Sequence, residues 1–241
     1  MRTEAFELSL RQSFINKNLT SERKYQPELL VNDNERGKKF LSNLLYELDN
    51  CDEFWISVAF VTTGGIATII NSLMNLKSKG VKGRVLVSQY LNFTQPEALR
   101  RLMQFTNIEL KIAVNDSFHS KGYLFKHGDI SNIIIGSSNL TQTALTLNKE
   151  WNLKISSAED GLINEQIKTE FEREFESALE VTYEYIEKYS EHWNKAKSFA
   201  KEIKLQTEKS KSVASPNKMQ NEALKSLLDL RDNGSKKALL I

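Results

Sequence analysis

Short apolar runs alternate with segments of helical periodicity along most of the chain, and this alternation restricts the possible fold more than any other feature. Residues 54–60 and 84–88 are nearly continuous apolar runs, the pattern of strands covered on both faces. Residues 107–114 alternate like a half-buried strand, and residues 122–125 and 133–135 are further short strands. Helical patterns occur at residues 36–48, at 66–76 and onward from Thr94. Strands alternating with helices predict an α/β domain with a central sheet and helices on both faces.

The second part of the chain is organised differently. From residue 159 to 203 the pattern is long and helical, acidic at first and then basic. Residues 204–215 are polar, rich in Lys and Ser and without apolar periodicity, which indicates a linker. Residues 216–241 combine an apolar helical pattern with a final strand-like run. We therefore expect a first domain over residues 1–203, a linker over 204–215, and the start of a further domain over 216–241. Because a single buried strand would leave unpaired edges, we expect the sequence to end inside that domain.

Composition and charge suit a folded cytoplasmic protein. The single cysteine, Cys51, excludes an internal disulfide and fits a reducing compartment. Neither a signal-peptide pattern nor an apolar run of membrane-spanning length is present, so we expect no membrane partner. Residues 1–158 hold 19 basic against 15 acidic side chains, residues 159–191 hold 3 against 11, and residues 192–241 hold 11 against 5. This distribution permits a nucleic-acid surface on the first segment without requiring one.

Five side chains at three predicted strand ends have the chemistry of phosphodiester cleavage. His119 and Lys121 are two residues apart, so on a strand both project to the same face, where an imidazole can attack phosphorus beside an ammonium that holds its oxygens. Ser137 and Asn139 follow an apolar strand and can supply further hydrogen-bond donors. Glu150 supplies a carboxylate that can fix the tautomer and orientation of His119. Nothing in this set requires a metal or a cofactor.

These segments resemble the phospholipase D superfamily signature HxK…GSxN, with the downstream NxE of the bacterial endonucleases in that group. The resemblance implies a phospholipase D-like mixed sheet and a phosphohistidine intermediate on His119. It implies that Lys121, Ser137 and Asn139 bind the phosphate. By the same resemblance, Glu150 would orient the histidine.

One position departs from the superfamily pattern. The full signature has an aspartate five residues after the lysine, and this sequence has Lys126 there. Some nucleases of the superfamily lack that aspartate, so we still expect activity and assign Lys126 to substrate binding. The alternative is a binding-only site in a catalytically inactive module for DNA binding and dimerisation.

Only one such motif is present, since His127 and His192 have no lysine two residues later. The superfamily mechanism uses two histidines, one as nucleophile and one as general acid. A chain with a single motif must borrow the second histidine, so we predict a homodimer with a shared active site.

Similarity to a second kind of enzyme extends over most of the chain. Residues 51–62 and 90–99 resemble the nuclease-like N-terminal region of large bacterial DEAD/DEAH-type helicases. Residues 216–224 resemble the lead-in to a superfamily 2 helicase core, in which Gln220 would recognise adenine. The phosphate-binding loop of such a core is not in this sequence, so we expect no ATP hydrolysis from it. The resemblance implies a helicase domain in the same full-length polypeptide.

The function predicted from these observations is metal-independent cleavage of DNA. Tyr90 and Asn92 follow a strand end, where α/β folds place ligands, and are candidate substrate-binding residues. The three tryptophans are expected to be packing residues rather than base-stacking platforms: Trp55, Trp151 and Trp193. A phospholipid hydrolase of the same superfamily is the further alternative, which the single motif, the absent export signal and the helicase-like tail argue against.

Overall fold

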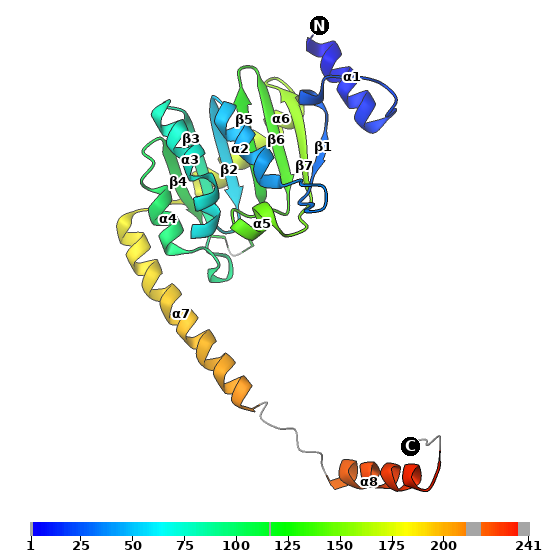
Figure 1. The fold of residues 1–241 in the computed structure, drawn as a ribbon. Helices are drawn as coiled ribbons and strands as arrows, with labels where there is room; N and C mark the ends of the chain where they lie inside the picture. Colours follow the sequence, from blue (N-terminus) through cyan, green and yellow to red (C-terminus); the bar gives the residue numbers. More distant parts are fainter. Residues whose placement is uncertain (1, 116, 211–217, 236–241) are drawn as a thin grey trace. The chain divides into compact units, whose positions relative to one another are not determined.

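A computed structural model describes residues 2–115, 117–210 and 218–235, without the side chains of residues 2, 90, 200 and 204–210. Its centre is an eight-stranded mixed sheet with the strand order β1-β7-β6-β5-β2-β3-β4-β8. Neighbours β2, β3 and β4 are parallel, and all other pairs are antiparallel (Figure 1). The strands are β1 (Glu28–Leu30), β2 (Glu53–Val58), β3 (Lys82–Ser88), β4 (Ile108–Ala113), β5 (Lys121–His127), β6 (Ile130–Gly136), β7 (Asn152–Ala158) and β8 (Leu179–Glu180).

Helices lie on both faces of this sheet, as the sequence predicts. Helices α2, α3, α4 and α5 bury their apolar side chains against one face, and α6 covers part of the other (Figure 1). The helices are α1 (Arg2–Phe14), α2 (Phe40–Asn50), α3 (Thr63–Ser78), α4 (Pro96–Leu102), α5 (Gln142–Thr146), α6 (Leu162–Ser177), α7 (Tyr183–Ser210) and α8 (Lys218–Asp232), with the 3-10 helices η1 (Arg23–Tyr25) and η2 (Tyr90–Asn92).

The alternation of side chains along β2 separates two cores. Phe54, Ile56 and Val58 point into the larger cluster under α2 and α3. Trp55 points to the opposite face, where it stacks on Phe171 of α6 with ring centroids 5.0 Å apart. Helices cover both faces of β2, so side chains on both faces are apolar. The sequence of this strand is therefore a nearly continuous apolar run.

One edge of the sheet collects the chain segments that carry the predicted site. Val58, at the carboxyl end of β2, pairs with Lys121, at the amino end of β5. Gly136, at the carboxyl end of β6, pairs with Asn152, at the amino end of β7. Antiparallel pairing thus brings strand ends that are far apart in the sequence to one side of the domain.

Beyond the sheet, the structure differs from the predicted linker. Helix α7 continues to Ser210, so residues 204–210 have a helical backbone where the sequence predicts a linker at 204–215. Lys, Glu and Gln in this stretch favour a helix even without an apolar face. Residues 211–217 and the predicted strand at 238–241 lie outside the described residues. The chain divides into two compact units, residues 1–194 and 195–241.

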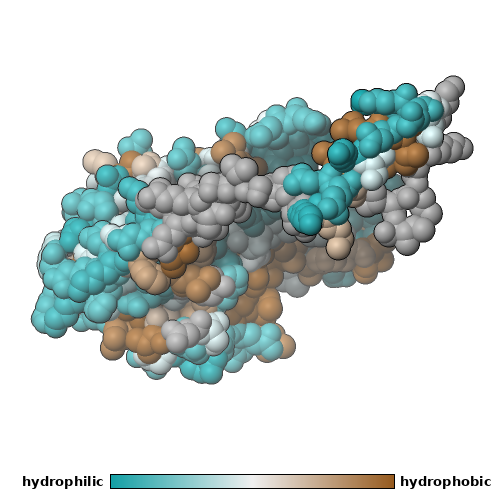
Figure 2. Space-filling model, turned by 90° about the horizontal axis from the view of Figure 1, so that it is seen from below, coloured by the Kyte–Doolittle hydropathy of each residue, from teal (hydrophilic) through white to brown (hydrophobic). Residues whose placement is uncertain are grey.

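On the face drawn in Figure 2, hydrophilic side chains surround several patches of apolar ones. Among the described residues, no helix has the length and apolar content needed to span a membrane.

Candidate active site

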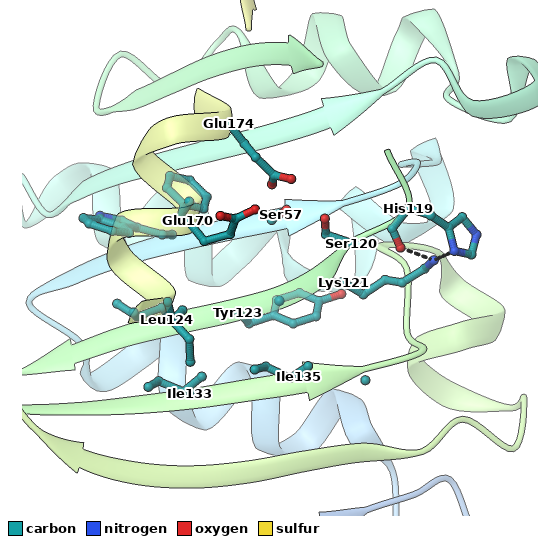
Figure 3. Close-up of a pocket in the computed structure, with 15 residues that line it drawn as sticks. Ser57, His119, Ser120, Lys121, Tyr123, Leu124, Ile133, Ile135, Glu170 and Glu174 are labelled. Atoms are coloured by element: carbon teal, nitrogen blue, oxygen red, sulfur yellow. Dashed lines mark hydrogen bonds between the residues drawn. The ribbon is translucent and has the colours of Figure 1, made fainter. Parts of the chain in front are cut away.

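His119 and Lys121 meet at the amino end of β5. Lys121 is the first residue of the strand, and His119 lies in the preceding loop rather than on the strand itself. The Lys121 ammonium contacts His119 Nδ1 at 2.7 Å and donates to the His119 carbonyl oxygen at 2.6 Å (Figure 3). The loop backbone and the lysine together hold the imidazole at the sheet edge, with Lys121 almost fully buried and His119 exposed.

The pKa values of both groups are shifted downward. Burial, and then the positive charge of Lys121, lower the pKa of His119 below its ordinary value of 6.5. Burial also lowers the pKa of Lys121, and the negative charge of Glu150 opposes that shift. A neutral imidazole at neutral pH keeps the lone pair that a nucleophile needs.

The position of the imidazole proton follows from the same contact. An ammonium group cannot accept a hydrogen bond, so Nδ1 of His119 must carry the lone pair and Nε2 the proton. Attack through Nε2 therefore requires the ring to leave Lys121 and donate from Nδ1 to a carboxylate, the role that the sequence assigns to Glu150.

The loop after β6 sets the distance between the site's hydroxyl and its carboxylate. A side chain at Gly136 would lie 2.2 Å from the Trp151 carbonyl oxygen, so only glycine permits β6 and β7 to approach this closely. Ser137 donates its hydroxyl proton to Glu150 and accepts a bond from the Trp151 amide at 3.1 Å. Because its one proton is used in this way, Ser137 holds the carboxylate in this structure rather than offering a donor to phosphate.

Asn139 is buried beside this loop. Its side-chain oxygen accepts a hydrogen bond from the Phe60 amide at 3.2 Å, which ties the loop to the end of β2. The amide oxygen is thereby fixed, and the amide nitrogen remains the group that can face an anion. Asn139 and Glu150 line one hollow of about 420 Å³, which also receives the amino-terminal residues of α3.

Three supporting residues have no local sequence signal. Asn152 accepts from the Ser138 amide at 3.2 Å and donates to the Ser138 hydroxyl at 2.9 Å. The buried Tyr123 donates to the Ser138 carbonyl oxygen at 2.9 Å. Asn32 donates to the carbonyl oxygens of Ala144 and Asn148, at 2.8 and 2.7 Å, and so holds the turn before Glu150. These bonds join residues 14 to 116 positions apart, which sequence periodicity does not reveal.

The comparisons with known proteins agree with this architecture. A family model described as "Cardiolipin synthase, PLD-like domain" matches residues 44–178. The chain belongs to this PLD-like family. The predicted phospholipase D-like mixed α/β fold is thereby confirmed, whereas the helicase core stays a prediction.

Three solved structures share the fold of this PLD-like chain. NucT from Helicobacter pylori has a TM-score of 0.52 and 18% identity, over 65% of this chain and 99% of its own. Nuc from Salmonella typhimurium, a phospholipase D family member, has a TM-score of 0.51 and 18% identity over the same shares. Phosphatidylserine synthase from Haemophilus influenzae Rd KW20 has a TM-score of 0.53 and 16% identity, over 74% of this chain and 46% of its own. At these identities the likeness establishes the fold alone. No curated protein matches the chain.

The structure separates Lys126 from the other predicted site residues of the PLD-like domain. Lys126 is at the far end of β5, five residues from Lys121 and so about 16 Å away along the strand. There it forms an ion pair with Glu159 at 2.7 Å. The assignment of Lys126 to substrate binding therefore has no geometric support, because successive strand residues run away from the sheet edge that holds His119.

The remaining candidates also lie apart from the His119 pair. Asn92 lines a different hollow, beside Ser88 and Gln89, and its carbonyl oxygen accepts a bond from Trp193 at 2.8 Å. The side chain of Tyr90 lies outside the described residues. Gln220 is in α8, within the second compact unit.

The tryptophans fall into two groups. Trp55 is buried and Trp193 packs against the larger core, as the sequence predicts. Trp151 instead has 71% of its surface exposed, next to Glu150, so the prediction that it packs inside the fold is wrong. The tight approach of Gly136 to the Trp151 backbone fixes the chain here and leaves the indole outside.

Proposed function

We propose that this PLD-like domain hydrolyses phosphodiester bonds in DNA through a phosphohistidine intermediate on His119. The observation that carries the proposal is the contact of His119 with Lys121, at a sheet edge that also presents Asn139 and Glu150. Nucleophilic attack on phosphorus requires an uncharged imidazole and a cation beside it. DNA as substrate rests on the resemblance to endonucleases and helicases described above.

Each step of the proposed reaction balances with the residues available. A nitrogen of His119 forms a bond to phosphorus as the P–O bond to the leaving group breaks. The Lys121 ammonium and the Asn139 amide nitrogen hold the nonbridging oxygens as negative charge develops. Water then attacks the phosphohistidine and gives a proton to the group that protonated the leaving oxygen, which releases a phosphate monoester and restores the imidazole. Ser137 positions Glu150, and Glu150 in turn accepts a hydrogen bond from Nδ1–H of the reoriented ring.

The leaving oxygen needs a proton, and we propose that a second copy of the chain supplies it through its own His119. The shared site of a homodimer then contains two histidines, one as nucleophile and one as general acid. A row of exposed apolar side chains beside the site offers the surface for this contact. Leu29, Leu153 and Ile135 are register partners across β1, β7 and β6, with 53%, 44% and 48% of their surfaces exposed.

Residues 216–241 are proposed to begin a helicase core. Helix α8 has several leucines, and none of its side chains is buried. The other elements of a helicase domain in the full-length polypeptide would cover the leucines of α8, and Gln220 would then bind adenine.

Cleavage in the presence of EDTA tests the proposed chemistry. Plasmid and single-stranded DNA are incubated with the wild type and with His119→Ala, and products are resolved on gels. We expect cutting by the wild type that survives EDTA and is lost in the variant. Intact substrate with the wild type, together with retained DNA binding, would overturn the proposal in favour of an inactive DNA-binding and dimerisation module.

Light scattering after size exclusion tests the proposed homodimer. Leu153→Glu places a charge in the middle of the apolar row, so we expect a monomer that has lost DNA cleavage. Leu162→Glu is the control, because Leu162 is also exposed but lies on α6. A wild type that is monomeric while cutting DNA would exclude the shared site.

A further inference from the structure

A cavity separate from the Asn139 hollow lies between α6 and the face of the sheet that α6 partly covers, and His119 and Lys121 form one end of it. Its volume is about 400 Å³, within the range of about 300–1,000 Å³ for small-molecule sites. Its apolar walls come from β2, β5, β6 and α6, and include Trp55, Leu124, Ile133 and Phe171. Ile135 on β6 borders both surfaces. The cavity extends from it across β5 and β2, whereas Leu153 and Leu29 lie in the opposite direction, on β7 and β1.

Ser57 is a buried polar group in this cavity without a partner. Its side chain projects from β2 into the cavity, only 7% of the residue is exposed, and its hydroxyl forms no hydrogen bond. Burying a hydroxyl without a partner is unfavourable, because the group loses its hydrogen bonds to water. A structure that retains such a group inside a cavity points to a ligand that satisfies it.

Two carboxylates lie above the same cavity. Glu170 and Glu174 are one helical turn apart on α6 and are drawn out toward the strand that carries Ser57 (Figure 3). Each oxygen of Glu170 also accepts a bond from Arg173, so among the described residues Glu174 is the carboxylate without a neighbouring cation bonded to it in the cavity. Burial, and then the charge of Glu170, raise the pKa of Glu174, and the charge of Arg173 opposes that shift. The carboxylate of Glu174 disfavours a second phosphate in this space.

Along its length the cavity passes from a cationic end to apolar walls and then to hydrogen-bond acceptors. A nucleotide carries chemical groups that match these three parts in the same order. The cationic end at Lys121 suits the phosphate, the aromatic and aliphatic walls suit a planar ring, and the acceptors at α6 suit N–H donors. Adenine, cytosine and guanine carry exocyclic amino groups, whereas thymine carries none, and the one N–H of its exposed edge is flanked by two carbonyl oxygens that a carboxylate repels. Stacking on aromatic side chains further favours an unpaired base.

We propose that this cavity binds the base next to the scissile phosphate, flipped out or single-stranded, and selects bases with an exocyclic amino group through Ser57, Glu170 and Glu174. The inference rests on the proposed function, since it assigns the cavity to the nucleotide whose phosphate meets His119. Ser57 and the two glutamates bind the base and take no part in bond breaking. Because a paired base cannot enter, the cavity gives a preference for single strands.

Binding to a non-cutting variant tests the cavity separately from the chemistry. Anisotropy titrations use His119→Ala with labelled oligo-dA, oligo-dC and oligo-dT of equal length. We expect oligo-dT to bind about tenfold more weakly than the other two, as loss of a hydrogen bond to a charged group predicts. Adding Ser57→Ala or Glu174→Gln should reduce that difference to within about twofold.

Glu176→Gln is the matched control, because Glu176 lies on the exposed side of α6 outside the cavity and loses the same charge. Circular dichroism melts establish that each variant is folded before it is titrated. Equal binding of all three oligonucleotides, or an unchanged difference in both Ser57→Ala and Glu174→Gln, would overturn the proposal. So would saturable binding of a short-chain phosphatidylcholine that these two substitutions weaken, because the cavity would then take a cationic headgroup.

The outcome for the proposed function is read from a different measurement. Cleavage of bis(p-nitrophenyl) phosphate needs no base, so its loss in His119→Ala reports the chemistry alone. If the wild type cleaves this ester but binds all three oligonucleotides equally, the proposed chemistry is supported and the base cavity is overturned. If the wild type cleaves nothing but binds the oligonucleotides in a base-dependent way, the proposed chemistry is overturned and the base cavity is supported.

Discussion

The two ends of β5 carry the same residue types and use them differently. At the far end, His127 donates to Glu47 at 2.8 Å, and Lys154 from β7 reaches the same fully buried carboxylate. At the near end, the neighbour of His119 is a lysine, and Glu150 is bonded to Ser137. The far end matches the Lys154 cation and the His127 ring N–H with a carboxylate, whereas the near end places two basic groups in contact. Removing one partner of a buried ion pair destabilises a fold, and a pair with shifted pKa values at a hollow is the arrangement expected of a reactive site.

The pKa shifts follow this difference. Burial raises the pKa of Glu47, but the hydrogen bond from His127 and the charge of Lys154 outweigh it, so the net shift is downward. At the near end, burial lowers the pKa of His119 and of Lys121, and the positive charge of Lys121 lowers that of His119 further. Burial therefore acts at both ends, and the sign of the neighbouring charge decides whether the group is held charged or neutral.

Replacing the near-end lysine should have the largest effect. In Lys121→Met the cation that holds the nonbridging oxygens is lost, and we expect DNA cleavage to fall about 10²–10³-fold. Thermal stability should change little, because the buried ammonium and its repulsion of His119 are removed together. Initial rates and melting temperatures against wild type measure both. A rate within threefold of wild type would remove Lys121 from the proposed mechanism.

A substitution at the far end should instead lower the stability of the fold and leave the cleavage rate unchanged. Glu47→Gln leaves the Lys154 ammonium and the His127 ring N–H without their buried carboxylate, and we expect the free energy of unfolding to fall by about 3 kcal/mol. Urea unfolding measures this fall, with rates of the folded enzyme unchanged.

The same variant has a pH signature. Because the pKa of Glu47 is lowered in the folded state, its stabilisation is complete above its ordinary value of 4.5 and is lost as the pH falls through the folded pKa. This part of the acid dependence should be missing in Glu47→Gln. Identical acid profiles for the variant and the wild type would show that the far-end cluster is not a stabilising ion pair.

A direct titration sharpens the comparison at the near end. The chain has three histidines, so the ring proton signals can be assigned by substitution. We expect His119 to titrate below 6.5 in the wild type and at a higher pH in Lys121→Met, since that substitution removes one cause of the lowered pKa. Because the proposed mechanism needs one His119 neutral and the partner's His119 protonated, cleavage by the wild type should follow a bell-shaped pH profile with its maximum below pH 6.5. A downward shift in the variant would contradict the assigned repulsion.

The smallest effect is expected at Lys126, where the superfamily pattern has an aspartate. Its ion pair with Glu159 is partly exposed, so Lys126→Ala should cost about 0–1 kcal/mol of stability and leave cleavage within about twofold of wild type. Stability and cleavage rate are measured for Lys126→Ala and Lys121→Met side by side, so that two lysines of the same strand are compared. A loss as large as that of Lys121→Met would restore Lys126 to the substrate site.

Features that depend on local pattern are predictable from the sequence. Apolar runs and helical periodicity specify which segments become strands and helices, because the two side-chain periods are properties of the backbone. The spacing of His119 and Lys121, and the glycine that ends β6, likewise mark strand ends. The predicted sheet with helices on both faces follows from these signals alone.

Tertiary structure decided which side chains meet. The partner of Ser137 is Glu150, Lys126 lies at the wrong end of its strand for the site, and Ser57 faces carboxylates more than 100 residues later in the sequence. The sequence also does not show that Trp151 is exposed. The physical reason is that strand pairing and the placement of α6 bring together groups that no local period relates, and a hydrogen bond or a cavity exists only once both sides are in place.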